Sequence, residues 1–245
     1  MIADAINARY VELEKSQRIE RPWKLGPSNI GGCLRQTAFM LDGFEGRAPG
    51  PDSLRVFELG HQRGARLEEL SKEIWPDAKS QVPVRLMAGP HEIKGTADLW
   101  IPSLRLVVDF KTTGAYGAGL LSTEGASADY QLQVHAYRRA IGEAECVAPA
   151  VINAVIVYEC KDSDARKGVK AGGLVEVEVP WTRELDVKLD TRLGEIERLL
   201  TLKELGQLDP LSVQGLPRTN WKCRSDKDGN PLYCPVGSKL GRCHE

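Results

Sequence analysis

The sequence lacks any long apolar run and any large excess of charge of one sign. No stretch approaches the roughly 18 consecutive apolar residues of a transmembrane helix. The first 20 residues carry mixed charges in an amphipathic pattern, unlike a secretory signal. The formal net charge is −1, which disfavours a passive nucleic-acid coat protein. We therefore expect a cytoplasmic protein without a membrane partner.

Internal repeats and long low-complexity segments are also absent from the sequence. The 245 residues are 42% hydrophobic and 27% charged, as is ordinary for a globular α/β protein. We expect a helical N-terminal region over residues 1–52 and a core over residues 53–205. A tail over residues 206–245 has little apolar content and is expected to form one structural unit with the N-terminal region.

Apolar spacing predicts an alternation of helices and strands. Ser28 and Thr182 are expected to be helix N-caps, and four glycines between residues 114 and 125 predict a loop. Helices are expected over residues 3–17, 53–75, 129–141 and 183–205. Strands are expected over residues 81–87, 92–100, 104–110, 151–159 and 174–179.

The most informative stretch is an expected β-hairpin that carries two carboxylates and a lysine. Asp98 closes its first strand, and Pro102-Ser103 forms the turn. Asp109 and Lys111 are two residues apart, so they point to one face of the second strand. Carboxylate oxygens suit Mg²⁺ or Mn²⁺, and converging charges are costly unless they bind something. The hairpin predicts a metal site, with a plain edge strand as the alternative.

The helices on either side of this hairpin carry further candidate groups. His61 lies on the preceding helix, and an imidazole is a good Mn²⁺ ligand; a surface histidine is the alternative. Glu68 or Glu69 is a weaker candidate for the same site. Gln133 and Tyr137 are four residues apart on the following helix, so they share one face. An amide and a hydroxyl there can position a phosphate or a base of DNA.

Together these residues resemble the motifs of the PD-(D/E)XK nuclease superfamily. Asp98 followed by Asp109-Phe110-Lys111 looks like the Asp…(Asp/Glu)-x-Lys signature. His61 matches the histidine of RecB-type members, and the Gln-x-x-x-Tyr motif is similar to that of the same branch. The resemblance implies an αβββαβ core with Asp98, Asp109 and Lys111 as catalytic residues. It also implies a metal held by His61, Asp98, Asp109 and the Phe110 carbonyl.

The cysteines extend this resemblance. An even number, six here, does not imply disulfides in a reducing cytosol. By resemblance to iron–sulfur RecB-type nucleases, such as the CRISPR-adaptation exonucleases and the AddB nuclease domain, four cysteines are expected to bind a [4Fe–4S] cluster: Cys33, Cys223, Cys234 and Cys243. Ten and eight residues separate the last three, a wider spacing than in that family. Zinc held by the same cysteines, or by three with His244, is therefore the alternative.

Cys146 and Cys160 flank an apolar strand and are expected to be small core residues. Several other side chains are candidates for lining a DNA path or stacking on bases: Arg35, Tyr116, His135, Arg138, Arg139, Trp221, Lys222 and Arg224. For each of these, a plain surface or packing role is the alternative.

The resemblance implies a Mg²⁺- or Mn²⁺-dependent DNA exonuclease acting on single-stranded DNA or DNA ends. Recombination, repair or CRISPR-adaptation-type processing is the implied setting, with a protein partner in a recombination or integration complex. One alternative is a non-catalytic or partner-dependent DNA-binding subunit of a larger nucleoprotein complex. A sequence-specific endonuclease is another.

Overall fold

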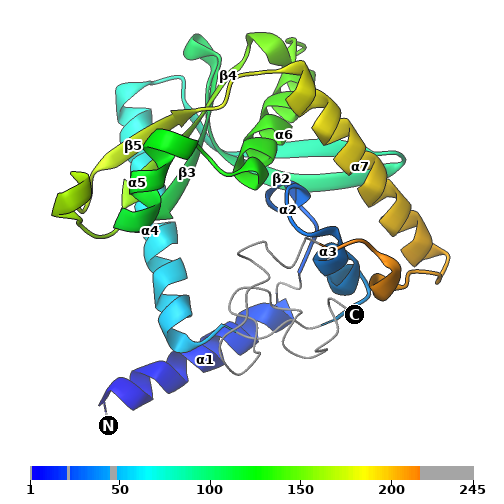
Figure 1. Ribbon diagram of the computed structural model, residues 1–245, viewed down its shortest axis with the longest axis horizontal. Helices are drawn as coiled ribbons and strands as arrows, with labels where there is room; N and C mark the ends of the chain where they lie inside the picture. Colours follow the sequence, from blue (N-terminus) through cyan, green and yellow to red (C-terminus); the bar gives the residue numbers. More distant parts are fainter. Residues whose placement is uncertain (1, 21–22, 45–48, 216–245) are drawn as a thin grey trace.

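The centre of the molecule is a five-stranded mixed sheet with the order β1-β2-β3-β4-β5 (Figure 1). The computed structural model describes residues 2–20, 23–44 and 49–215. β3 and β4 pair in parallel, and every other neighbouring pair is antiparallel. A parallel pair needs a crossover connection, which contains helices here. The strands are β1 (Lys79–Ala88), β2 (His91–Ile101), β3 (Leu106–Thr113), β4 (Asn153–Cys160) and β5 (Leu174–Glu178).

Helices cover parts of this sheet (Figure 1). The helices are α1 (Ile2–Glu20), α2 (Pro27–Ile30), α3 (Leu34–Leu41), α4 (Pro51–Ile74), α5 (Ala115–Glu124), α6 (Ala128–Ala144) and α7 (Arg183–Glu204). α6 contacts β1, β3 and β4, α7 lies over α6 and β1, and α4 contacts β1, β2 and β3. α1 packs on α4 instead. From α4 to β4 the order is one helix, three strands, two helices and one strand, which confirms the mixed α/β prediction.

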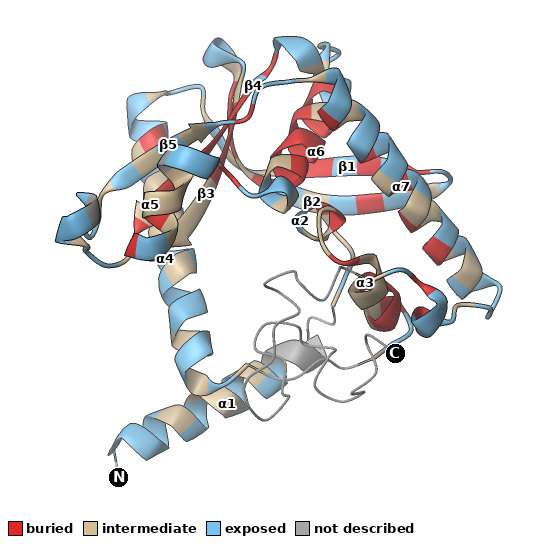
Figure 2. Cartoon of the chain, viewed as in Figure 1, coloured by how far each residue is buried: buried red, intermediate tan, exposed pale blue. Residues whose placement is uncertain are grey.

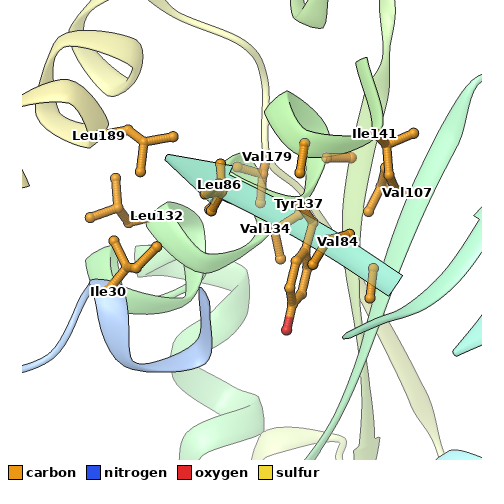
Figure 3. Close-up of a cluster of buried hydrophobic side chains, with 14 of the residues drawn as sticks. Ile30, Val84, Leu86, Val107, Leu132, Val134, Tyr137, Ile141, Val179 and Leu189 are labelled. Carbon is orange, nitrogen blue, oxygen red and sulfur yellow. The ribbon is translucent and has the colours of Figure 1, made fainter. Parts of the chain in front are cut away.

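The sheet buries apolar side chains on both faces, and Figure 2 shows that buried residues gather along the central strands and α6. Alternate residues of β2 divide between two clusters, because successive strand residues point to opposite faces. Trp100 joins the large cluster with α6 and α7, whereas Leu99 and Ile101 join a smaller one with Val108. Figure 3 shows part of the large cluster, with Tyr137 and Leu189 among its members. Residues 132–138 of α6 are all buried, so this helix is enclosed between the sheet and α7. Within the described ranges, no helix has the length and apolarity needed to cross a bilayer.

Of the two predicted helix N-caps, one is confirmed and the other is wrong. Thr182 is the N-cap of α7, and its hydroxyl accepts a hydrogen bond of 3.1 Å from the Leu185 N–H. Ser28 is not an N-cap, because α2 begins one residue earlier, at Pro27, after Gly26. The fixed φ of proline suits the first helical position, and the Gly26 N–H donates to Asn29 Oδ1 at 3.2 Å.

The loop predicted between residues 114 and 125 is wrong, because most of it forms α5. Asp162 Oδ1 accepts a hydrogen bond of 2.5 Å from the Ala115 N–H in the first turn of this helix. A Cβ at Gly117 would lie 2.4 Å from Thr113 Oγ1. The glycine therefore permits close packing of α5 on the end of β3, and glycine spacing in a sequence does not distinguish this role from a loop.

The predicted hairpin is present but its boundaries differ. β2 continues past Asp98 to Ile101, and a short 3₁₀ helix (Pro102–Leu104) forms the turn. Arg105 follows with a left-handed φ of 47°, and β3 begins only at Leu106. Asp98 therefore lies inside β2 rather than at its end, and Lys111 lies inside β3.

Candidate active site

Asp98 lies where β2 and β3 stop pairing. Their antiparallel register runs from Ile101 opposite Leu106 to Leu99 opposite Val108 and extends no further. Directly beyond it, Asp98 Oδ2 accepts a hydrogen bond of 2.8 Å from the Phe110 N–H. Backbone donors inside a protein need a partner, and here a side chain supplies it. At this point Asp98 lies close enough to Asp109 for the two carboxylates to interact.

A second irregularity lies on the other side of β2. Ser80 pairs with Leu99 and Val82 with Ala97, but Gln81 and Asp98 between them do not pair. Gln81 has a φ of 51°, a left-handed backbone that costs a non-glycine residue about 1–2 kcal/mol. Nothing in the sequence marks this position, because glutamine is not typical of left-handed backbone.

The side chain of Gln81 turns toward α4 and contacts a third carboxylate of the site. Gln81 Nε2 donates a hydrogen bond of 2.7 Å to Glu68 Oε1. Glu68 is buried, and it lies close enough to Asp98 for their charges to interact. Glu69 is exposed and pairs with Arg66 at 3.2 Å. Of the two weaker candidates, the structure brings Glu68 to the site and leaves Glu69 on the surface.

Asp109 is fully buried and is contacted from two sides. Its Oδ1 accepts a hydrogen bond of 3.0 Å from Gln133 Nε2, which also donates at 2.9 Å to the Tyr137 hydroxyl. Lys111 Nζ lies 2.6 Å from Asp109 Oδ2. Besides this ion pair, Oδ2 has no hydrogen-bond partner within the described part of the chain. One oxygen of Asp109 is thus fixed by α6, and the other lies against the Lys111 ammonium.

Burial raises the pKa of both aspartates of this site. It raises the pKa of Asp109 to about 6, with Lys111 opposing and Asp98 adding to the shift. It also raises the pKa of Asp98, against the Phe110 N–H and the nearby Lys111 and His61. These carboxylates are poorly solvated and close together, so added positive charge would favour their ionised forms.

His61 reaches the site from α4. It is exposed, and it lies near enough to Asp98 to lower the pKa of that carboxyl. Its neighbour Gly60 lies against β3, where a Cβ would stand 3.4 Å from Thr112 Oγ1. The predicted group of His61, Asp98, Asp109 and Lys111 is therefore brought to one place by α4, β2 and β3.

Carboxylate oxygens, the main candidate ligands at this site, are the type of ligand that a hard divalent cation prefers. Mg²⁺ keeps several waters and needs only one or two carboxylates from the protein, and two are present here, the buried Asp109 and the half-buried Asp98. In the described ranges, no three His, Cys, Asp or Glu side chains are gathered closely enough to enclose a metal ion by themselves. The positive charge that lies against Asp109 here is the Lys111 ammonium.

Gln133 and Tyr137 lie at the site, but they are buried rather than presented to solvent. Both are 4% exposed. The hydrogen bonds described above link them to Asp109 and to each other. Their contact with a DNA strand stays a prediction, whereas their hold on Asp109 is a feature of the structure.

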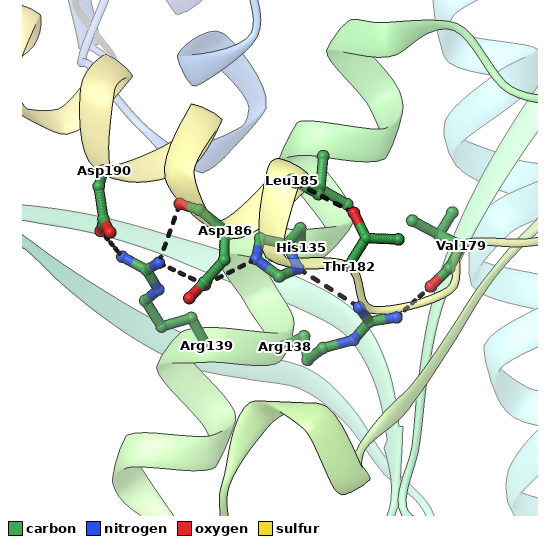
Figure 4. Close-up of polar contacts among 8 residues, drawn as sticks. All are labelled: His135, Arg138, Arg139, Val179, Thr182, Leu185, Asp186 and Asp190. Atoms are coloured by element: carbon green, nitrogen blue, oxygen red, sulfur yellow. Dashed lines mark hydrogen bonds and ion pairs between the residues drawn. The ribbon is translucent and has the colours of Figure 1, made fainter.

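Three residues predicted to lie near DNA belong instead to a largely buried polar cluster between α6 and α7 (Figure 4). His135 Nε2 lies 3.0 Å from Asp186 Oδ1, and Arg138 contacts His135 Nδ1 at 3.3 Å and the Val179 carbonyl. Burial lowers the pKa of Arg138 to about 10. Arg139 completes the cluster through ion pairs with Asp186 and Asp190. The predictions for His135 and Arg138 were wrong because both side chains point away from solvent.

Cys33 is buried and is the N-cap residue of α3. Two residues on, Arg35 Nε donates a hydrogen bond of 2.6 Å to the Val213 carbonyl, so the first part of the tail lies beside the start of α3. The other predicted ligands, Cys223, Cys234, Cys243 and His244, lie outside the described residues, as do Trp221, Lys222 and Arg224.

The remaining two cysteines differ from each other. Cys160 is buried at the end of β4, as predicted. Cys146 is exposed, with a left-handed φ of 54° just after α6. The prediction of a core position for Cys146 was wrong, because it falls in the turn that ends α6.

Comparison with known proteins gives similarity of fold. No protein-family model and no curated protein matches the chain. The crystal structure of SSO0001 is similar with a TM-score of 0.55 and 15% identity, over 100% of this chain and 98% of that one. The crystal structure of a phage-related exonuclease from Haemophilus somnus 129PT gives a TM-score of 0.46 and 17% identity, over 77% of this chain and 99% of that one. The first of these likenesses extends over the full described fold.

Proposed function

We propose that this protein is a metal-dependent DNA exonuclease of the PD-(D/E)XK type. The observation that carries the proposal is the convergence of Asp98, Asp109 and Lys111 where β2 and β3 separate, with Lys111 Nζ 2.6 Å from Asp109 Oδ2. Two poorly solvated carboxylates beside an ammonium are unfavourable for stability alone. Such a cost is typical of sites where chemistry takes place.

Each residue has a role in the proposed hydrolysis. Asp98, Asp109, His61 and the Phe110 carbonyl would hold Mg²⁺ or Mn²⁺, which when bound supplies a water of lowered pKa and neutralises phosphate charge. Lys111 orients the attacking water and stabilises negative charge that develops on the phosphate. Gln133 keeps the Asp109 carboxylate in a fixed orientation through its hydrogen bond to Oδ1.

The test is cleavage of end-labelled single-stranded DNA and of blunt duplex DNA with Mg²⁺, Mn²⁺ or EDTA. Lys111→Ala and Asp98→Asn should lose cleavage by at least about 100-fold while remaining folded. Lys94→Ala is the matched control, since this exposed lysine of β2 pairs only with Glu92, at 2.8 Å, among the described ion pairs. Cleavage by Lys111→Ala at the rate of the unaltered chain would overturn the proposal.

Covalently closed single-stranded DNA distinguishes an exonuclease from an endonuclease. An exonuclease degrades linear DNA and leaves the closed circle intact, because it needs an end. Cutting of the circle would replace the exonuclease proposal with endonuclease action. DNA binding without cleavage under any metal condition would favour the non-catalytic subunit.

We also propose that Cys33 contributes to a [4Fe–4S] cluster with Cys223, Cys234 and Cys243. Support comes from the hydrogen bond of Arg35 to Val213, which brings the chain that leads to the last three cysteines beside the helix that Cys33 begins. Anaerobic purification followed by iron, sulfide and zinc analysis is the test. Four irons and four sulfides per chain are expected, and stoichiometric zinc without iron would replace the cluster with a zinc site.

A further inference from the structure

Lys111 has a second contact besides Asp109. Its ammonium lies 5.2 Å from the centre of the Tyr130 ring, within the range in which an aromatic face attracts a cation. A lysine side chain is long and flexible, and fixing it costs about 2 kcal/mol of rotamer entropy. The ion pair with Asp109 restrains the ammonium through one contact, at 2.6 Å. The ring supplies a second contact with the same ammonium, from a different element of the fold.

The Tyr130 ring is itself held in place by the sheet. Tyr130 lies in the first turn of α6, and its ring packs against Tyr158 with centroids 6.5 Å apart and planes tilted by 54°. Tyr158 is buried, and it is the residue of β4 that pairs directly with Lys111 in the parallel ladder. Lys111, Tyr130 and Tyr158 thus form a closed set of three neighbours from β3, α6 and β4.

We propose that Tyr130 is a positioning residue that holds the Lys111 ammonium over Asp109. The proposal rests on the proposed function only for its effect on cleavage, because the placement of the ammonium can be measured without DNA. The ring performs this role and the hydroxyl does not, since among the described residues the Tyr130 hydroxyl makes no hydrogen bond. The Tyr130 side chain is 36% exposed, so a base of the DNA stacking on it is the competing role.

The kinetic test compares Tyr130→Phe, which keeps the ring, with Tyr130→Leu, which removes it. Tyr130→Leu should lower kcat about 5- to 30-fold with KM nearly unchanged, and Tyr130→Phe should retain wild-type kcat. Tyr10→Leu is the matched control, since it removes another ring that faces a cation, Arg55 at 5.7 Å, on α1 rather than at the site. A rise in KM at constant kcat for Tyr130→Leu would assign the ring to DNA stacking and overturn the positioning role.

The spectroscopic test follows the ammonium directly. In protein labelled with ¹³C-lysine, the ε-methylene signal of Lys111, assigned by its loss in Lys111→Arg, should be shifted upfield by the Tyr130 ring current. The shift should disappear in Tyr130→Leu and persist in Tyr130→Phe and Tyr10→Leu. An unshifted signal in the unaltered chain would overturn the proposal. If the shift behaves as expected but no variant cleaves DNA, the placement stands and the proposed function fails instead.

Discussion

The side-chain amide of Gln133 joins Asp109 to Tyr137 by using both of its hydrogens, at 3.0 Å and 2.9 Å. A glutamine amide has two donors on one nitrogen, so this arrangement fixes the orientation of its side chain. Asp109 is consequently held by a neutral donor from α6 as well as by the charged Lys111 of its own strand. The first prediction concerns this link.

Replacing Gln133 by leucine should damage the site more than the fold. Asp109 Oδ1 would lose the donor that orients it, so cleavage should fall by roughly 10- to 100-fold, with a loss of about 1–3 kcal/mol in unfolding free energy. Gln131→Leu is the control, because Gln131 Nε2 donates to the Ala126 carbonyl at 2.6 Å and does not contact Asp109. Cleavage rates and urea unfolding of the two variants provide the comparison, and equal losses of activity would contradict the role of Gln133.

Asp109→Asn should stabilise the metal-free protein at neutral pH while removing activity. The pKa of Asp109 in the folded state is about 6, above its ordinary value of 3.8, so its ionisation opposes folding. That cost is absent well below pH 4 and fully present above pH 6. In EDTA at pH 7.5 the variant should gain up to about 3 kcal/mol in unfolding free energy, and the gain should vanish near pH 4.

A carboxylate with the opposite shift serves as control for that measurement. The Ser103 N–H donates to Asp77 Oδ2 at 2.6 Å and lowers the pKa of that carboxyl. Ionised Asp77 therefore favours folding, so Asp77→Asn should destabilise the protein at pH 7.5, with the loss shrinking as the pH falls below 4. If Asp77→Asn and Asp109→Asn change the unfolding free energy at pH 7.5 in the same direction, the pKa shift assigned to one of the two residues is wrong.

Because Gln81 has a left-handed backbone, its glycine variant should be more stable than its alanine variant, which reverses the usual order of stability. Both Gln81→Ala and Gln81→Gly remove the hydrogen bond to Glu68, but only glycine also relieves the backbone strain. Gln81→Gly should therefore be more stable than Gln81→Ala by about 1 kcal/mol in urea unfolding. At Arg85, on the same strand without a positive φ, the alanine variant should be the more stable by about 0.5–1 kcal/mol. The same order at both positions would exclude strain at Gln81.

The cluster between α6 and α7 should make stability fall as the pH drops. Burial lowers the pKa of His135, and the nearby charge of Arg138 lowers it further. The hydrogen bond with Asp186 opposes this shift. Below about pH 6.5 the unfolded chain binds a proton that the folded chain does not, so folding loses up to about 1.4 kcal/mol per pH unit until the folded pKa is reached. His135→Gln should show a shallower loss than the unaltered chain between pH 7 and 5.5. Equal slopes would mean that His135 does not titrate between the two states.

The sequence predicted which residues of the candidate site lie together better than it predicted what surrounds them, for a physical reason. Period-two and period-four spacing determine which side chains share a face, and this was sufficient to place Asp109 with Lys111 and Gln133 with Tyr137. The partners of His135 and Arg138 lie 51 and 41 residues away in the chain. Local spacing carries no information on such distant partners, so these two residues were assigned to the surface.

Backbone conformation was the other source of error. Gly117 was taken as a sign of a loop, although its role is to let α5 approach Thr113. The conformation of Gln81 depends on how β1, β2 and α4 meet, which no local pattern reveals. Both cases concern contacts between elements rather than preferences within one.

The enclosure of α6 determines which parts of the protein are free to adjust. One side of this helix holds Asp109 through Gln133, and another is fixed to α7 through His135 and Arg138. By contrast, only Glu68 and Ser71 of α4 are buried. We therefore expect α6 to act as a rigid wall when a substrate enters, and the movement that admits it to be made by α4 and the histidine it carries.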